Sequence, residues 1–183
     1  HVEHSYSHAW QSYQKLLKQR NAMLKYGSSA AELSAWTNQL AEFGKVITER
    51  RSSYLVGFVK VFNEVWGELM PSMPLPKLEF SKGWSGDDLL ESLLACSEQD
   101  RRFGYTTCGP HRCDLRVFSD GVEVFDYYSQ GQQKALTYAL KVAQGIYLKN
   151  LTAREVVYLI DDLPAELDSI RLSAVLELLA NHA

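Results

Sequence analysis

The first seventy residues repeat apolar side chains at helical spacing. One stripe, with steps of three, four and seven residues, comprises Tyr6, Trp10, Tyr13, Leu17 and Leu24. It predicts a helix over residues 5–25, and Gly27 is typical of a helix end. Four basic side chains lie largely off this stripe, namely Lys15, Lys18, Arg20 and Lys25. They form either a solvated helix face or a strip that faces phosphates.

A second and much longer helix is predicted over residues 29–70. Its leading apolar positions repeat every seven residues, at Leu33, Leu40, Ile47, Tyr54 and Val61. The accompanying apolar side chains change position along the repeat, from Trp36 and Phe43 to Phe58 and Val65. This change indicates a drift or a break near residues 50–51. The simplest arrangement is an antiparallel helical arm, which Pro71, Pro74 and Pro76 then end.

Beyond the prolines the pattern alternates between strands and helices. Strands are predicted at 78–80, 105–107, 114–118, 122–125 and 156–160, and helices at 87–100, from Ser129, and at 169–179. Ser119-Asp120-Gly121 predicts a hairpin turn. The fold class is therefore mixed α/β, with a helical arm over residues 1–76 and a lobe of strands and helices over 77–183.

Composition narrows the class of protein. The chain has 183 residues, of which 46% are hydrophobic, and its net charge is −3. A folded protein without a membrane span or signal peptide is expected, and nucleic-acid binding would need local basic patches. Three unpaired cysteines fit the cytoplasm. Cys108, His111 and Cys113 lack a fourth neighbouring ligand, so ordinary packing is favoured over a zinc site.

Residues 128–134 predict a loop that opens a helix and suits a phosphate. Ser129 and Gln132 have the spacing of a capping box, and a helix start offers free N–H groups with a positive dipole end. A plain capped helix explains Ser129 and Gln132 equally well. It explains Gly131 poorly, because glycine in a first helical turn costs stability. The amides of Gln130 and Gln132 complete the candidate phosphate site.

The predicted buried strand at 156–160 ends on Asp161 and Asp162. One carboxylate at such a position can hold Mg²⁺, and the other can orient or deprotonate an attacking water. The alternative is an ordinary acidic turn. A tight loop then leads to another carboxylate, Asp168, at the start of the last helix. No G-x-x-x-x-G-K-[ST] sequence occurs, so we expect the nucleotide site to be incomplete within this chain.

These segments together resemble the ABC-type ATPases. Residues 129–133 are similar to the signature motif of that family, residues 156–162 to the Walker B strand, and residues 165–168 to the D-loop. The sequence Gly-Pro-His-Arg-Cys-Asp-Leu at 109–115 is similar to the GPHRDDL segment of the RecF family. The segment at 18–22 and that around Trp36 also fit the helical region of the RecF family.

The resemblance implies a Rad50/SMC-like ATPase head with a short arm. The family binds ATP and Mg²⁺ between two protomers, forms an ATP-dependent homodimer and hydrolyses ATP slowly. It binds DNA, favouring duplex next to single strand, and acts with RecR and RecO in loading RecA at gaps. The N-terminal Walker A portion is expected to be missing here, so the chain alone is predicted to be inactive.

Carried onto this sequence, the resemblance implies roles for seven residues. Asp161 would ligate Mg²⁺, Asp162 would act in catalysis, and Asp168 would organise the dimer interface. The ATP-binding set comprises Ser129, Gln130, Gly131 and Gln132. Two positions depart from the family, Gln130 in the signature motif and Cys113, which replaces an Asp.

Two alternatives remain open at this point. The chain could be a non-catalytic protein-interaction module made of a helical arm and an acidic lobe. Arg112 could contact a phosphate, or it could pair with Asp114 or Asp126.

Overall fold

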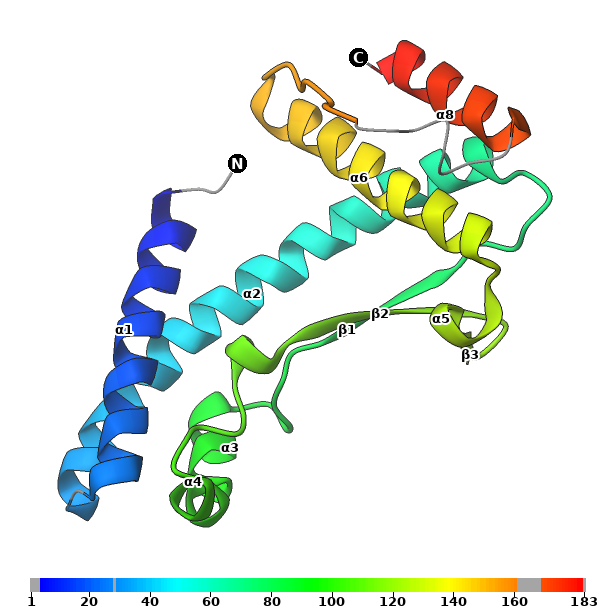
Figure 1. Ribbon diagram of the computed structural model, residues 1–183. Coiled ribbons are helices and arrows are strands. Elements are labelled where there is room, and N and C mark those ends of the chain that lie inside the picture. The colour runs from blue at the N-terminus through cyan, green and yellow to red at the C-terminus, as the bar shows by residue number, and fades with distance from the viewer. Residues whose placement is uncertain (1–3, 28, 161–168, 183) are drawn as a thin grey trace. The chain divides into compact units, whose positions relative to one another are not determined.

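A computed structural model describes residues 4–27, 29–160 and 169–182. Helices dominate it, and one small sheet has the strand order β1-β2-β3 (Figure 1). The residues form two compact units. Among the described residues, the α1 unit comprises residues 4–53 and 80–115, and the α6 unit comprises residues 54–79, 116–160 and 169–182. Each unit therefore combines residues from both predicted subdomains, 1–76 and 77–183. The boundary between the two units does not coincide with residues 76 and 77.

Helices α1 (His4–Tyr26) and α2 (Ala30–Leu69) occur where the periodicity predicts them. The predicted break near residues 50–51 is absent, because α2 continues without interruption for 40 residues. The apolar stripe of α2 changes position because the helix contributes buried side chains to two separate hydrophobic cores, one in each unit. Leu40 and Ile47 are buried in the core of the α1 unit, whereas Phe58 and Phe62 are buried in that of the α6 unit.

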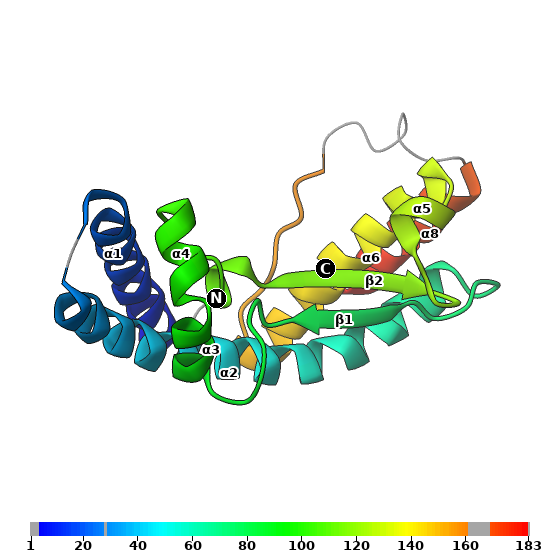
Figure 2. The same cartoon turned by 90° about the horizontal axis from the view of Figure 1, so that it is seen from below.

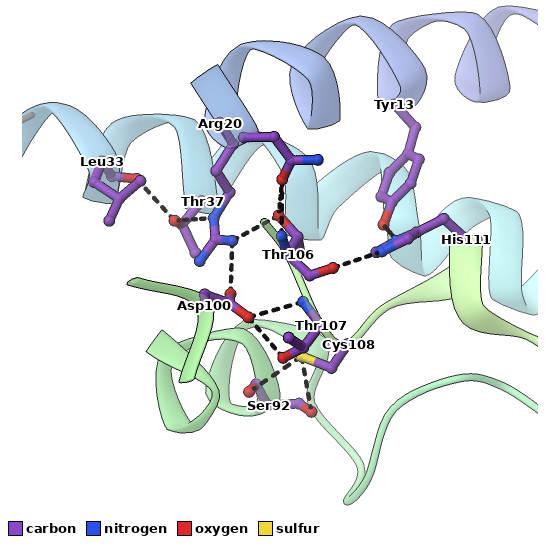
Figure 3. Close-up of polar contacts among 11 residues, drawn as sticks. Tyr13, Arg20, Leu33, Thr37, Ser92, Asp100, Thr106, Thr107, Cys108 and His111 are labelled. Atoms are coloured by element: carbon purple, nitrogen blue, oxygen red, sulfur yellow. Dashed lines mark hydrogen bonds and ion pairs between the residues drawn. The ribbon is translucent and has the colours of Figure 1, made fainter. Parts of the chain in front are cut away.

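A buried ion pair lies within the α1 unit (Figure 3). Arg20 and Asp100 are 1% and 0% exposed, and Arg20 Nη1 donates to Asp100 Oδ2 at 2.7 Å. Arg20 also donates to the hydroxyls of Thr37 and Thr106 at 3.0 and 2.7 Å. Buried charges are tolerated only when paired and hydrogen-bonded in this way. The prediction that Arg20 shares an exposed basic face is thus wrong.

The segment predicted as one helix over 87–100 is two helices, α3 (Leu89–Ala95) and α4 (Ser97–Phe103). Asp88 caps the first, because its carboxylate accepts the N–H groups of Leu90 and Glu91. Cys96 lies between the two helices, and its N–H bonds to the carbonyls of Leu94 and Ser92.

The hairpin is formed by β2 (Asp114–Ser119) and β3 (Val122–Glu123), which pair antiparallel. Ser119 lies opposite Val122, so Asp120 and Gly121 form a two-residue loop. Both have positive φ, 50° and 80°, as a type I′ turn requires. The predicted turn is confirmed, although β3 ends early at helix α5 (Val124–Tyr127). The predicted strand at 105–107 does not form.

Strand β1 (Lys77–Ser81) lies beside β2 in the sheet (Figure 2). In the α6 unit, helix α6 (Gln130–Thr152) contacts α8 (Ser169–His182). Aromatic rings fill the core of this unit, and neighbouring centroids along the row lie 5.8 to 6.3 Å apart. The row comprises Tyr54, Phe58, Phe62, Trp66 and Tyr128. Tyr128 immediately precedes the candidate phosphate loop, so this core fixes where the loop begins.

Candidate functional site

Ser129 is the N-cap of α6, as its spacing to Gln132 predicts. Ser129 Oγ accepts the Gln132 N–H at 3.4 Å, and the Ser129 N–H donates to Gln132 Oε1 at 2.8 Å. The capping box is complete in both directions. Ser129 and Gln130 are exposed at the start of this 23-residue helix, whereas residues 131–134 are half-buried.

The glutamine side chains of this segment hold the loop in place. Gln132 Nε2 donates to Met73 Sδ at 3.5 Å. Gln133 Nε2 donates to the carbonyls of Tyr128 and Phe125, at 2.9 and 3.3 Å. The side chain of Gln132 is therefore engaged within the protein, and its backbone N–H already donates to Ser129 Oγ.

The packing of a neighbouring side chain explains the glycine at position 131, and the sequence alone does not predict this contact. A Cβ atom at this position would lie 2.9 Å from Nη1 of Arg171 and 3.6 Å from its Cζ. Arg171 belongs to α8, 40 residues further along the chain. Its guanidinium thus lies against the first turn of α6 and adds positive charge to the positive end of the helix dipole. The only sequence signal was a glycine placed where helix propensity disfavours it.

The acidic half of the predicted site lies outside the described residues. Asp161, Asp162 and Asp168 belong to the segment that the structure does not describe. Their predicted roles in binding Mg²⁺, in catalysis and at a dimer interface remain predictions.

The prediction of a buried strand over residues 156–160 is wrong for this structure. The segment pairs with no described strand, and Val157 and Leu159 are 81% and 93% exposed. Tyr158 anchors it, because its hydroxyl donates to the Val142 carbonyl at 3.1 Å over Gly145. A strand needs neighbours for its backbone N–H and C=O groups, and the three described strands do not supply them here.

The segment at 109–115 has a structural role in the α1 unit. His111 Nε2 lies 3.1 Å from the Thr106 carbonyl, which can only accept, so this nitrogen carries the proton. Nδ1 then accepts the hydroxyl proton of Tyr13 at 2.7 Å (Figure 3). Burial lowers the pKa of His111, and the nearby Arg112 lowers it further. A neutral imidazole therefore ties α1 to the loop at 106.

Cys113 stands where the family segment has an aspartate, and it faces a cation. Arg51 Nη1 donates to Cys113 Sγ at 2.8 Å and to the Pro110 carbonyl at 2.6 Å. Thiol sulfur is a weak acceptor, so this hydrogen bond is weaker than one to a carboxylate would be. Arg112 is exposed and forms no ion pair with a described carboxylate, which disfavours the predicted pairing with Asp114.

In residues 4–27, 29–160 and 169–182, no three His, Cys, Asp or Glu side chains are placed to hold a metal ion. Within the same part of the chain, every helix is too short or too polar to cross a membrane.

Comparison with known proteins gives consistent matches. No family model matches the chain. The DNA replication and repair protein RecF of Coxiella burnetii is 41% identical over 179 residues, which cover 97% of this chain and 50% of that protein. RecF of Vibrio cholerae is 38% identical over 172 residues, covering 93% and 47%. The chain spans about half the length of these relatives.

Solved structures agree with these relatives. A structure of the recombination mediator protein RecF-ATP in the RecFOR pathway superposes with a TM-score of 0.82 at 26% identity. The match covers 96% of this chain and 50% of that one. A RecF-ATPrS structure gives a TM-score of 0.80 at the same identity.

Proposed function

Because the chain is related to the RecF proteins in sequence and shares their fold over the matched half, we propose that it is part of an ATP-dependent DNA-binding recombination mediator. The mediator would act in the repair of DNA gaps and in replication restart. One observation carries the proposal. The capped start of α6 combines an exposed Ser129 with a glycine that admits the Arg171 guanidinium.

This loop would close over ATP that a second subunit holds. The hydroxyl of Ser129 and the backbone of residues 130–132 would reach the γ-phosphate, with helix N–H groups and the Arg171 charge favouring the anion. Asp161 and Asp162 would act on the other face of the site, on Mg²⁺ and on the attacking water. Asp168 would organise the interface between the subunits. The resemblance to the ABC-type ATPases supports these three assignments.

The proposed partners follow from the relatives. The solved structures are described as belonging to the RecFOR pathway, and two of them contain RecF with ATP or ATPrS. We accordingly assign DNA, RecR and RecO as partners of the whole protein in the cytoplasm, with RecA acting downstream and Mg²⁺ accompanying ATP.

The chain itself can test the role of Ser129. Tagged chain is mixed with RecF of Coxiella burnetii, and the captured RecF is measured with ATPγS and with ADP. We expect capture that needs ATPγS and that falls at least about tenfold in Ser129→Arg, because the larger cation fills the phosphate position. Ser129→Asp keeps a good N-cap but repels phosphate, so it should lose capture as well.

The matched control is Thr137→Arg, which places the same side chain at an exposed position on the same helix. Capture by this variant should equal that of the wild type. Capture could instead be the same with ADP and with ATPγS and be unchanged in both Ser129 variants. That result would favour the non-catalytic interaction module.

A further inference from the structure

Exposed aromatic and basic side chains gather where α1 and α4 end. We call this surface the aromatic tip, and it comprises Lys25, Tyr26, Arg101, Arg102, Phe103 and Tyr105. The two helices contact each other within the α1 unit (Figure 1). The rings of Tyr26, Phe103 and Tyr105 are 79%, 49% and 46% exposed. Exposed large apolar groups that cluster, rather than occurring singly, mark interaction sites.

The geometry of the tip is fixed by its surroundings. Gly104 ends α4 with φ of 74°, and the rings of Phe103 and Tyr105 on either side of it stack at 5.8 Å and 17°. A Cβ at Gly104 would lie 3.9 Å from Lys25 Cα, so the last turn of α1 is adjacent. Asn21 Oδ1 accepts from both the backbone N–H and the hydroxyl of Thr106, which anchors the segment to α1.

Two carboxylates, Glu98 and Asp100, belong to the helix that carries Arg101 and Arg102. Asp100 is buried against Arg20, and Glu32 is bound by the hydroxyl and the N–H of Ser29. Glu98 is the remaining carboxylate of α4 and lies about one turn before the two arginines. Basic residues in a last turn suit the helix dipole, but that effect does not account for three exposed rings beside them.

We propose that the aromatic tip binds single-stranded nucleic acid. Arg101, Arg102 and Lys25 contact phosphates, while Phe103 and Tyr105 stack unpaired bases. Duplex fits poorly, because its bases are already stacked and paired and do not offer their faces to side chains. The inference rests on the DNA-binding part of the proposed function and is independent of ATP.

Fluorescence anisotropy of the 183-residue chain tests the proposal, with labelled oligothymidylate of about twenty nucleotides as the probe. Phe103→Leu/Tyr105→Leu keeps apolar side chains but removes the rings, and we expect affinity to fall about tenfold or more. Arg101→Gln/Arg102→Gln should make the slope of log affinity against log salt shallower by about 1.4. All four side chains are exposed, so the variants should retain the fold, which circular dichroism checks.

Lys77→Gln/Arg154→Gln removes the same charge from exposed side chains of the α6 unit and should bind like the wild type. A duplex of equal length should bind more weakly, and its affinity should be insensitive to loss of the rings. Oligouridylate provides the RNA arm. If oligouridylate binds as tightly as oligothymidylate, the tip accepts both RNA and DNA. If oligouridylate binds more weakly, the tip prefers DNA.

Photocrosslinking to 5-iodouracil in the probe locates the contact. Trypsin cleaves after Arg102 and Arg112, so both rings lie in one peptide, which should carry the crosslink. Absence of binding, a crosslink elsewhere, or unchanged affinity in the ring variant would overturn the proposal. If the chain binds the probe but the crosslink lies in another peptide, the proposed DNA-binding function is still supported and only the assignment to the aromatic tip is wrong. Failure of the Ser129 capture experiment would not affect the proposal for the aromatic tip, because that proposal is independent of ATP.

Discussion

At the residue scale, the Arg20–Asp100 pair shows what a local pattern cannot reveal. The partners are 80 residues apart, and Arg20 resembles its exposed neighbours in the sequence. Caps are different, because Ser129 and Gln132 interact across three residues and were predicted correctly. Contacts within one turn can be inferred from spacing, whereas a buried ion pair depends on the tertiary fold.

The buried pair predicts strong energetic coupling. Asp100→Asn keeps an acceptor for Thr107 but leaves the Arg20 charge unpaired, so it should lower the free energy of unfolding by about 3–5 kcal/mol. Adding Arg20→Met to this variant removes the unpaired buried charge. In urea denaturation, the double variant should therefore lose about 1–3 kcal/mol less than the sum of the single losses.

The exposed pair Arg116–Glu123, at 2.6 Å, is the control for this measurement. Glu123→Gln should cost much less than Asp100→Asn, because water screens the charge. Additive losses at positions 20 and 100 would show that the buried pair is not coupled.

His111 predicts a pH dependence of stability. Its pKa is lowered in the folded protein, first by burial, whereas the unfolded value is roughly 6.5. The unfolded chain therefore binds more protons as the pH falls through that value, and the free energy of unfolding decreases toward the lower folded pKa. The stabilising contribution is fully present above about pH 7.

Denaturation at pH 7.5 and at pH 5.5 measures this effect. His111→Gln can still donate to the Thr106 carbonyl but does not titrate. Its stability should change less between the two pH values than that of the wild type. Equal changes in both proteins would remove His111 as the source.

At the element scale, the glycines of α2 separate helix propensity from packing. A Cβ at Gly67 would meet no atom within 4 Å, so Gly67→Ala should raise the free energy of unfolding by about 0.5–1 kcal/mol. A Cβ at Gly44 would lie 2.4 Å from Leu89 Cδ2 and 3.2 Å from Tyr13 Cε2.

Gly44→Ala should therefore lower the free energy of unfolding by about 1–3 kcal/mol, despite the same gain in propensity. Urea denaturation of the two variants side by side checks both signs. Stabilisation by Gly44→Ala would mean that Leu89 and Tyr13 move aside at little cost.

The elements that were predicted and those that were not differ in what holds them. The helices α1 and α2 and the β2–β3 hairpin follow from periodicity and turn residues, which act locally. Residues 156–160 have the apolar composition of a buried strand, but composition does not supply the neighbouring strands. The split at Cys96 depends on backbone hydrogen bonds that spacing does not reveal.

At the scale of the whole molecule, the chain matches half the length of its relatives and has no P-loop sequence. We expect purified chain with MgATP to release no phosphate above background, because no Walker A lysine and loop cradle the nucleotide. A phosphate-release assay over a range of chain concentrations checks this. Turnover that scales with the chain and disappears in Ser129→Asp would show that another phosphate cradle exists.

The sequence could indicate the components of an ATP site but not their assembly. The signature segment folds as predicted, and the structure adds Arg171 beside it. The carboxylates at 161, 162 and 168 lie outside the described residues. The proposed site would be completed across two subunits by residues far apart in sequence, and single-chain periodicity carries no information on their distance.

The uninterrupted helix α2 sets a constraint on chain length. Ile47 and Phe58 are eleven residues apart, about three turns of helix, and each is buried in the core of its own unit. Inserting one residue between them would rotate all later side chains by about 100° and advance them by about 1.5 Å. Substitutions at exposed positions in this interval are tolerable, but single insertions and deletions are not. Among related sequences, the exposed positions of this stretch should vary in composition, while its length stays constant.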